Sequence, residues 1–239
     1  MAKERAKFGQ CVYCYRLGRI TRDHIPPKNL FARPRPNTLI TVPCCLKCND
    51  AAGKDDEYFR LMLSMREDVA QHPEVVRILP EIIRSLHKPE KDRLMRRVLQ
   101  SIESTPFYTW SGLYAGNFPA YDVSLERLSM TVARITKGLF YHETGRMLPE
   151  THAVMAATEP FANARDPDDL ERRAEKVLSV KPKVIGEGVF SYRVHFIDGR
   201  PNDSQWYFEF FGVVPFLSLT IAEAALGTRH NNSLNPTPR

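Results

Sequence analysis

The spacing of apolar residues divides the chain into a helical middle and a β-rich last third. Apolar side chains recur every three or four positions over residues 54–72, 91–102 and 124–145, which is the period of an amphipathic helix. The second of these stretches carries arginines on its other face, which can follow a phosphate backbone or simply face solvent. In the third stretch Gly145 marks the end of the predicted helix, and its apolar face is made of Leu125, Leu128, Val132, Ile135 and Leu139.

Alternation of apolar and polar residues predicts strands at both ends of the chain. Apolar residues alternate with polar ones over residues 189–197 and continue at every second position through Trp206, Phe208 and Phe210 in residues 205–214, and the turn-forming residues 198–204 between them predict a hairpin loop. Near the N-terminus, residues 39–42 read as a short strand that follows a proline-rich spacer. The segment after it can begin a helix, although Gly53 leaves the start of that helix open.

Composition and charge narrow the class of protein. The chain has 239 residues, of which 43% are hydrophobic, so it can bury the core of one large domain or of two unequal ones. Its net charge of +6 favours a polyanionic partner, but this charge alone does not distinguish one function from another. No apolar run approaches the length of a bilayer-spanning helix, and the N-terminus lacks the apolar region of a secretory signal. We therefore expect a cytoplasmic protein with no membrane partner.

All five cysteines lie in the first 48 residues. Cys11 and Cys14 form one C-x-x-C pair, and Cys44, Cys45 and Cys48 supply a second. In a reducing compartment such pairs are typically metal ligands, since four thiolates complete a tetrahedral zinc site. We assign Cys45 and Cys48 as the second pair because their spacing repeats that of the first, which leaves Cys44 as a spare thiol. A redox pair or a group of buried cysteines is the alternative.

Asp23 and His24 stand together inside the loop that such a zinc ion would close. Pro26 and Pro27 follow at once and favour extended backbone, so we expect the Asp-His pair at the end of a strand. A histidine with an ordinary pKa of about 6.5 can act as a general base, and a carboxylate is a hard oxygen ligand for Mg2+ or Mn2+. Taken alone, however, such a pair is more often a surface feature than a catalytic one.

Two asparagines and two arginines complete the candidate set. Asn37 precedes the N-terminal 39–42 strand, and Asn49 directly follows the last cysteine. Alone, these would be a turn residue and a polar helical position. Arg33 and Arg35 lie in the proline-rich spacer, where they can reach DNA phosphates or only keep a surface loop soluble.

Together these residues resemble the HNH nuclease family, also called ββα-metal, over about residues 11–57. The family order is C-x-x-C, Asp-His, an Asn before a short strand, C-x-x-C, and then His or Asn. Asn49 in the last place makes this the HNN variant. The resemblance implies that His24 is the general base and that Asp23 and Asn49 hold a catalytic Mg2+ or Mn2+. It also implies that Asn37 orients the histidine and that a structural Zn2+ stabilises the module.

We therefore predict an α+β protein that begins with a zinc-stabilised ββα-metal, treble-clef-like module over residues 1–57. A helical segment and then an antiparallel β region of unknown role would occupy residues 58–228, followed by a disordered tail over residues 229–239. The predicted function is a divalent-metal-dependent endonuclease that hydrolyses phosphodiester bonds, with DNA as the expected partner. The alternative is a zinc-stabilised module that binds nucleic acid or protein without catalysis, which would have no need of the Asp-His and Asn49 set.

Overall fold

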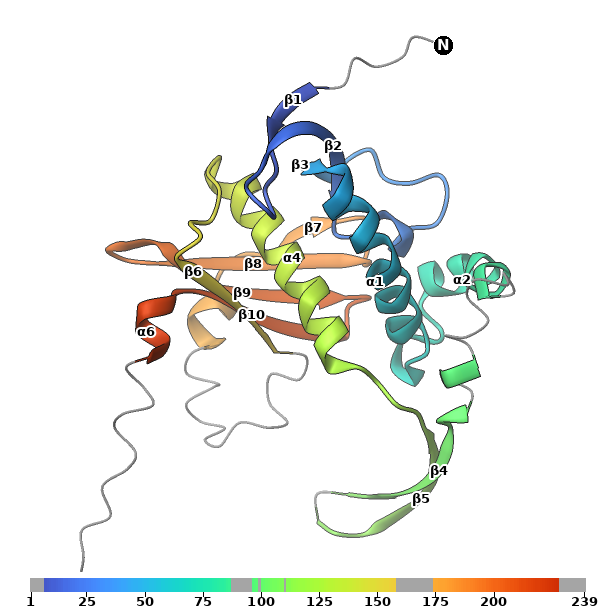
Figure 1. Cartoon of the computed structure of the whole chain (residues 1–239). Helices are drawn as coiled ribbons and strands as arrows, with labels where there is room; N and C mark the ends of the chain where they lie inside the picture. The colour runs from blue at the N-terminus through green and yellow to red at the C-terminus, as the bar shows by residue number, and fades with distance from the viewer. Residues whose placement is uncertain (1–6, 87–95, 99, 110, 158–173, 228–239) are drawn as a thin grey trace, which may run out of the picture.

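The computed structural model describes residues 7–86, 96–98, 100–109, 111–157 and 174–227 of the chain. Two long helices, α1 (Leu46–Ser64) and α4 (Leu125–Thr144), lie side by side against one face of a five-stranded sheet (Figure 1). A three-stranded sheet lies beside these helices at the N-terminal end of α1, and a two-stranded ribbon projects from the opposite end of the molecule. The mixed α+β class predicted from the sequence is thus confirmed for the described residues.

The five-stranded sheet is antiparallel, with the order β6-β10-β9-β8-β7. Its strands are β6 (His152–Ala157), β7 (Lys183–Ile185), β8 (Phe190–Ile197), β9 (Arg200–Phe210) and β10 (Val214–Ala222). The predicted hairpin is confirmed as β8 and β9, but the loop predicted over residues 198–204 is wrong. Only Asp198 and Gly199 form the turn, because an Asp-Gly pair suits a two-residue hairpin turn and Gly199 supplies the positive φ of 71°.

The helix predicted over residues 124–145 is confirmed as α4 (Leu125–Thr144). The side chain of Ser124 caps its N-terminus by accepting the N–H of Arg127, and Gly145 ends it with a φ of 67°. These are the usual start and stop signals of a helix. The predicted helix over residues 91–102 lies partly outside the described residues. Within that range, residues 96–98 and 100 are described and helical.

α1 (Leu46–Ser64) begins at the second C-x-x-C pair and continues through Gly53 without a break. The predicted extension of this helical segment to residue 72 is wrong, since the chain turns after Ser64 into a short 3-10 helix, η2 (Glu67–Val69). A helix that the sequence analysis did not identify, α2 (Pro73–Leu86), follows. Within the described part of the chain, no helix is both long and apolar enough to cross a membrane.

The three-stranded sheet consists of β1 (Lys7–Gln10), β2 (Leu17–Ile25) and β3 (Ile40–Cys45) in the order β1-β2-β3. Both strands predicted on either side of the proline-rich spacer are therefore present, and they pair antiparallel with Asp23 opposite Val42 and His24 opposite Thr41. A single 3-10 turn, η1 (Lys28–Leu30), lies in the spacer. This hairpin carries the predicted Asp-His pair within two residues of the end of β2.

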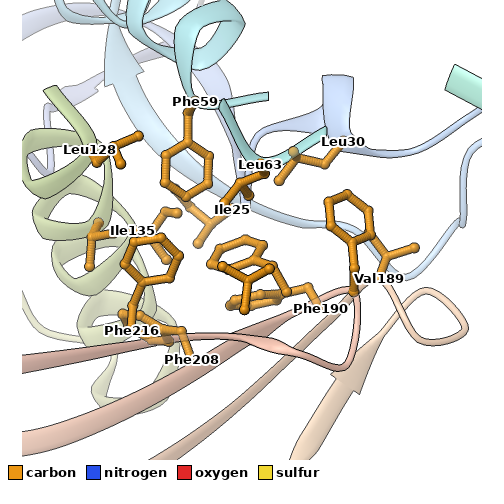
Figure 2. Packing of buried hydrophobic residues seen from close by; sticks show 14 of the residues in the cluster. Ile25, Leu30, Phe59, Leu63, Leu128, Ile135, Val189, Phe190, Phe208 and Phe216 are labelled. Carbon is orange, nitrogen blue, oxygen red and sulfur yellow. The ribbon is translucent and has the colours of Figure 1, made fainter. Parts of the chain in front are cut away.

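One hydrophobic core joins the N-terminal hairpin to the rest of the described chain (Figure 2). Ile25 and Leu30, both fully buried, point into the same cluster as Phe59 of α1 and Phe190 of β8. Phe59 packs edge-on against Phe210, with ring centroids 5.2 Å apart. The predicted boundary at residue 57 falls inside α1, and the predicted tail over residues 229–239 lies outside the described residues.

The ribbon of β4 (Glu103–Tyr108) and β5 (Tyr114–Ala120) is exposed on both faces. Its aromatic rings contact one another across the strands, as Phe107 and Phe118 do at 5.7 Å. A last short helix, α6 (Glu223–Gly227), follows β10. Neither the ribbon nor α6 contributes to the predicted site.

Candidate functional site

The four cysteines predicted as ligands come together where the β1–β2 turn meets the N-terminus of α1. The sulfur atoms of Cys11, Cys14, Cys45 and Cys48 all lie within 4.8 Å of one another, and Cys14 Sγ is 3.7 Å from Cys45 Sγ. Thiolates bound to one zinc ion at about 2.3 Å stand roughly 3.8 Å apart, so the cluster can hold a metal such as zinc. The structure brings Cys45 into this cluster and leaves Cys44 outside it, with the Cys44 thiol donating to the carbonyl oxygen of Cys45.

The local structure explains why two adjacent cysteines differ. Side chains alternate along β3, so Cys44 is turned inward and fully buried while Cys45 faces the cluster. Cys45 is also the N-cap of α1, where its sulfur accepts the N–H of Cys48 at 3.5 Å. The N-terminus of a helix carries partial positive charge, which favours thiolates at that end.

The thiols of the cluster influence one another's ionisation. Burial acts to raise the pKa of Cys11, but backbone N–H groups, that of Cys45 first among them, lower the pKa to about 7. The pKa of Cys48 is raised by burial and by the neighbouring thiols, and burial raises that of Cys44 outside the cluster. Thiols crowded into one site resist joint ionisation, and a bound dication would relieve this by binding all four thiolates.

Asp23 lies on β2 with its side chain turned toward α1 and α4, and the residue is 5% exposed. Its Oδ2 accepts hydrogen bonds from Tyr13 Oη at 2.7 Å and from Arg134 Nη1 at 2.9 Å. Its Oδ1 has no hydrogen-bond partner among the described residues and is not a fully enclosed atom. One carboxylate oxygen is thus fixed by the protein, and the other is available as a ligand.

Asn49 lies in the first turn of α1 and contacts the strand that carries Asp23. Its Nδ2 donates to Thr21 Oγ1 at 3.0 Å, and this hydroxyl donates to the carbonyl oxygen of Cys44 at 2.9 Å. Thr21 and Asp23 are two positions apart on β2, so their side chains share a face at a spacing of about 7 Å. The structure therefore brings Asn49 and Asp23 to one face of the hairpin, with the amide oxygen of Asn49 unbonded within the described part of the chain.

His24 lies on the opposite face of β2 from Asp23, because adjacent side chains of a strand point to opposite sides. Its side chain is half-buried. Burial lowers the pKa of His24 below 6.5, the positive charges of Lys28 and Arg35 lower it further, and Asp23 acts in the other direction. The imidazole is accordingly neutral near pH 7, which is the proton-accepting form.

Asn37 is exposed in the turn before β3. No hydrogen bond joins it to His24 among the residues that the structure describes. The orienting role implied for Asn37 therefore stays a prediction.

The two spacer arginines are placed differently. Arg35 folds back, and its Nε donates to the carbonyl oxygen of Lys28 at 2.9 Å, which brings both cations to the side of His24. Arg33 is exposed, and its Nε lies 3.9 Å from Glu81 Oε1. Of the two spacer arginines, Arg35 is thus the one whose charge acts on the predicted general base.

The sequence analysis missed Arg134 of α4, which is 111 positions from Asp23 in the chain. Its guanidinium bridges Asp23 and Asp56, donating to Asp56 through Nη2. Burial raises the pKa of Asp56 to about 7, and Arg134 acts to lower it. The available signal was a second stripe on the predicted helix, where Arg127, Arg134 and Gly138 recur at helical spacing beside the apolar face.

Comparisons of the chain with family models, with curated proteins and with solved structures found no match. The resemblance to HNH nucleases accordingly stays a prediction based on the motif residues. What the structure adds is a four-cysteine cluster beside a hairpin, with Asp23 and Asn49 on one face of that hairpin and His24 on the other.

Proposed function

We propose that the protein is a divalent-metal-dependent nuclease of the HNH type that hydrolyses phosphodiester bonds in DNA. The observation that carries this proposal is the placement beside one strand of two oxygens, Asp23 Oδ1 and Asn49 Oδ1, that have no hydrogen-bond partner among the described residues. Mg2+ typically takes one or two protein oxygens and keeps several waters for a phosphate, so these residues fit such an ion. When bound there, the ion would neutralise phosphate charge and stabilise the leaving oxygen.

His24 supplies the proton acceptor in this proposal. Its lowered pKa keeps the imidazole neutral at pH 7, and its half-exposed side chain can take a proton from an attacking water. Lys28 and Arg35 give the same side of the hairpin the positive charge that a phosphate backbone requires. Because Asp23 and His24 lie on opposite faces of β2, the scissile phosphate would have to be reached from both faces of this strand.

The cysteine cluster holds a structural zinc ion in this proposal, since four thiolates with tetrahedral spacing suit that metal. The ion would connect the β1–β2 turn to the end of β3 and the first turn of α1. It would thereby fix Asn49, which directly follows Cys48, relative to the strand that carries Asp23.

A second candidate function is a zinc-stabilised module that binds nucleic acid or protein without catalysis. The observation that favours it is the ion pair between Arg134 and Asp23 at 2.9 Å. Arg134 already supplies a positive partner to this buried carboxylate, so its charge does not require a metal ion.

Incubation of the full-length protein with plasmid DNA in Mg2+ or Mn2+ tests the proposal. The parent should cut the plasmid, and His24→Ala should cut it about 100- to 10,000-fold more slowly, because a general base contributes to the transition state. His195→Ala on β8 is a matched control that removes a partly buried histidine far from the hairpin in sequence. Equal rates for His24→Ala and the parent would refute the role of His24. If the protein binds DNA but neither cleaves it nor binds Mn2+, the second candidate function is favoured.

The path of DNA can be followed by the salt dependence of binding to the His24→Ala protein. Each phosphate contact that is lost should reduce the slope of log K against log salt by about 0.9. We expect this reduction for Arg35→Ala, whose side chain lies beside His24, and also for Arg33→Ala, as the sequence predicts. An unchanged slope would remove that arginine from the interface.

A further inference from the structure

We infer that Arg134 and Tyr13 are positioning residues for the metal ligand Asp23, because they hold one carboxylate oxygen and leave the other directed to the ion. This inference rests on the proposed function, since it names the side chains that would prepare its metal site. Both lie outside the set of residues that the HNH resemblance identifies.

Arg134 fixes Asp23 relative to two helices at once. Its side chain is 12% exposed and that of Asp23 is 7% exposed, so their pair at 2.9 Å is largely withdrawn from water. The same guanidinium donates to Asp56 of α1 through its other terminal nitrogen. A planar guanidinium with both ends engaged has little rotational freedom. One side chain therefore sets the relative positions of β2, α1 and α4 around the carboxylate.

Tyr13 holds the same carboxylate oxygen from the side of the cysteine cluster. It lies between Cys11 and Cys14 of the first C-x-x-C pair, and its Oη donates to Asp23 Oδ2 at 2.7 Å. Two donors from different parts of the chain thus converge on one oxygen. The cluster that would bind the structural metal is thereby linked to the ligand of the second metal.

Gly138 provides the room for this contact. It lies four residues, about one turn, after Arg134 on α4. A Cβ at this position would lie 2.6 Å from Ile25 Cγ1 and 3.4 Å from Tyr13 Oη. The absence of a side chain lets α4 approach β2 closely enough for Arg134 to reach Asp23.

The expected consequence concerns metal affinity. A ligating carboxylate whose second oxygen is held by hydrogen bonds is already oriented when the ion arrives, and removing such partners typically costs about 10- to 100-fold in affinity. Asn49 Oδ1 and Asp23 Oδ1 would then face the ion in fixed positions. Loss of either positioning residue should weaken the binding of the ion without changing its identity.

The test is direct Mn2+ binding to the full-length protein without nucleic acid, measured from the electron paramagnetic resonance signal of free Mn2+. Tyr13→Phe removes one hydroxyl, and Arg134→Lys keeps the charge but cannot bridge both carboxylates. Each should raise the dissociation constant for Mn2+ about 10- to 100-fold. Tyr13→Phe preserves the ring, so it decides the outcome even if Arg134→Lys fails to fold.

Arg127→Lys is the matched control. Arg127 lies two turns before Arg134 on α4 and donates to Asp55, the neighbour of Asp56, with Nε 2.8 Å from Oδ1. Its replacement removes a comparable pair between α4 and α1 without touching Asp23. The dissociation constant for Mn2+ should therefore stay within about twofold of the parent value, since this partly exposed pair does not include Asp23.

Cleavage measured against Mn2+ concentration gives the second readout. In Tyr13→Phe the half-saturating Mn2+ concentration should rise with the dissociation constant, while the rate at saturating Mn2+ recovers. Unchanged Mn2+ binding in both variants, or an equal loss in Arg127→Lys, would overturn the inference. A parent protein that neither binds Mn2+ nor cleaves DNA would instead refute the proposed function, and the inference with it.

Discussion

The adjacent cysteines of β3 offer a test in which one substitution should remove metal and its neighbour should not. Cys45 Sγ belongs to the four-sulfur cluster, whereas Cys44 Sγ is buried and donates to the carbonyl oxygen of Cys45. Cys45→Ser and Cys44→Ser therefore make the same chemical change at consecutive positions. The structure predicts that Cys45→Ser loses metal affinity, whereas Cys44→Ser keeps the metal and loses only some folding stability.

The magnitude for Cys45→Ser follows from sharing the zinc-binding energy among the ligands. Structural zinc sites contribute about 10 to 16 kcal/mol in total, or roughly 2.5 to 4 kcal/mol for each of four thiolates. Losing one ligand should weaken zinc binding about 100- to 1,000-fold. Helix α1 itself should be little affected, because serine is a preferred N-cap and can accept the N–H of Cys48 in place of the sulfur.

The magnitude for Cys44→Ser follows from burial. The side chain is fully enclosed, so a hydroxyl there costs about 1 to 3 kcal/mol of folding stability, lessened by its hydrogen bond to the carbonyl of Cys45. Zinc affinity should stay close to that of the parent.

Zinc transfer to a chromophoric chelator, with chemical denaturation of each variant, measures both quantities. The parent and Cys44→Ser should release zinc at the same chelator concentration, and Cys45→Ser should release it at a far lower one. Loss of zinc from Cys44→Ser with retention in Cys45→Ser would show that the cluster is assigned to the wrong thiol.

Four further predictions concern the titration of His24 and the packing of the core. The rate of DNA cleavage should fall as pH drops through the pKa of His24. The midpoint should lie below 6.5, because burial and nearby cations disfavour the imidazolium form. A midpoint above 6.5 in the pH profile of kcat/KM would contradict this. Because the pKa of His24 is lowered in the folded state, the unfolded chain binds more protons at this residue when the pH is below about 6.5. Folding stability should therefore also decrease as pH falls below about 6.5, which denaturation at several pH values measures. Phe59→Ala should cost about 3 to 5 kcal/mol in denaturation experiments, whereas Phe107→Ala, at a side chain whose residue is 57% exposed, should change stability by less than about 0.5 kcal/mol. Gly138→Ala should cost about 1 to 3 kcal/mol of folding stability because its Cβ would meet Ile25 at 2.6 Å. Gly53→Ala on α1, with open space around it, should increase folding stability by up to about 1 kcal/mol. Equal thermal shifts for the two glycine variants would contradict the close packing of α4 on β2.

The sequence by itself determined the features that depend on local pattern. Repeated C-x-x-C spacing identified the four cysteines that the structure brings together, Cys45 among them, because two thiols separated by two residues can occupy two corners of one tetrahedron. Helical period and a terminal glycine identified α4, and alternation identified the hairpin of β8 and β9. The Asp-Gly turn of that hairpin is also a local signal, which the sequence analysis read as a longer loop.

The opposite orientation of Asp23 and His24 was also within reach of the sequence. Once the pair is assigned to a strand, alternation places the two side chains on opposite faces. A substrate would therefore have to be reached from both faces of β2.

Only the tertiary structure decided what surrounds Asp23. Arg134 is 111 positions away in the chain, and its contact depends on α4 crossing the hairpin at the close distance that Gly138 permits. Nothing in the local pattern around either residue encodes that approach, because a helix shows its apolar face but not the element that the face will cover. The burial of one carboxylate oxygen and the freedom of the other are consequences of that packing, so they follow from the fold of the whole chain and not from the motif.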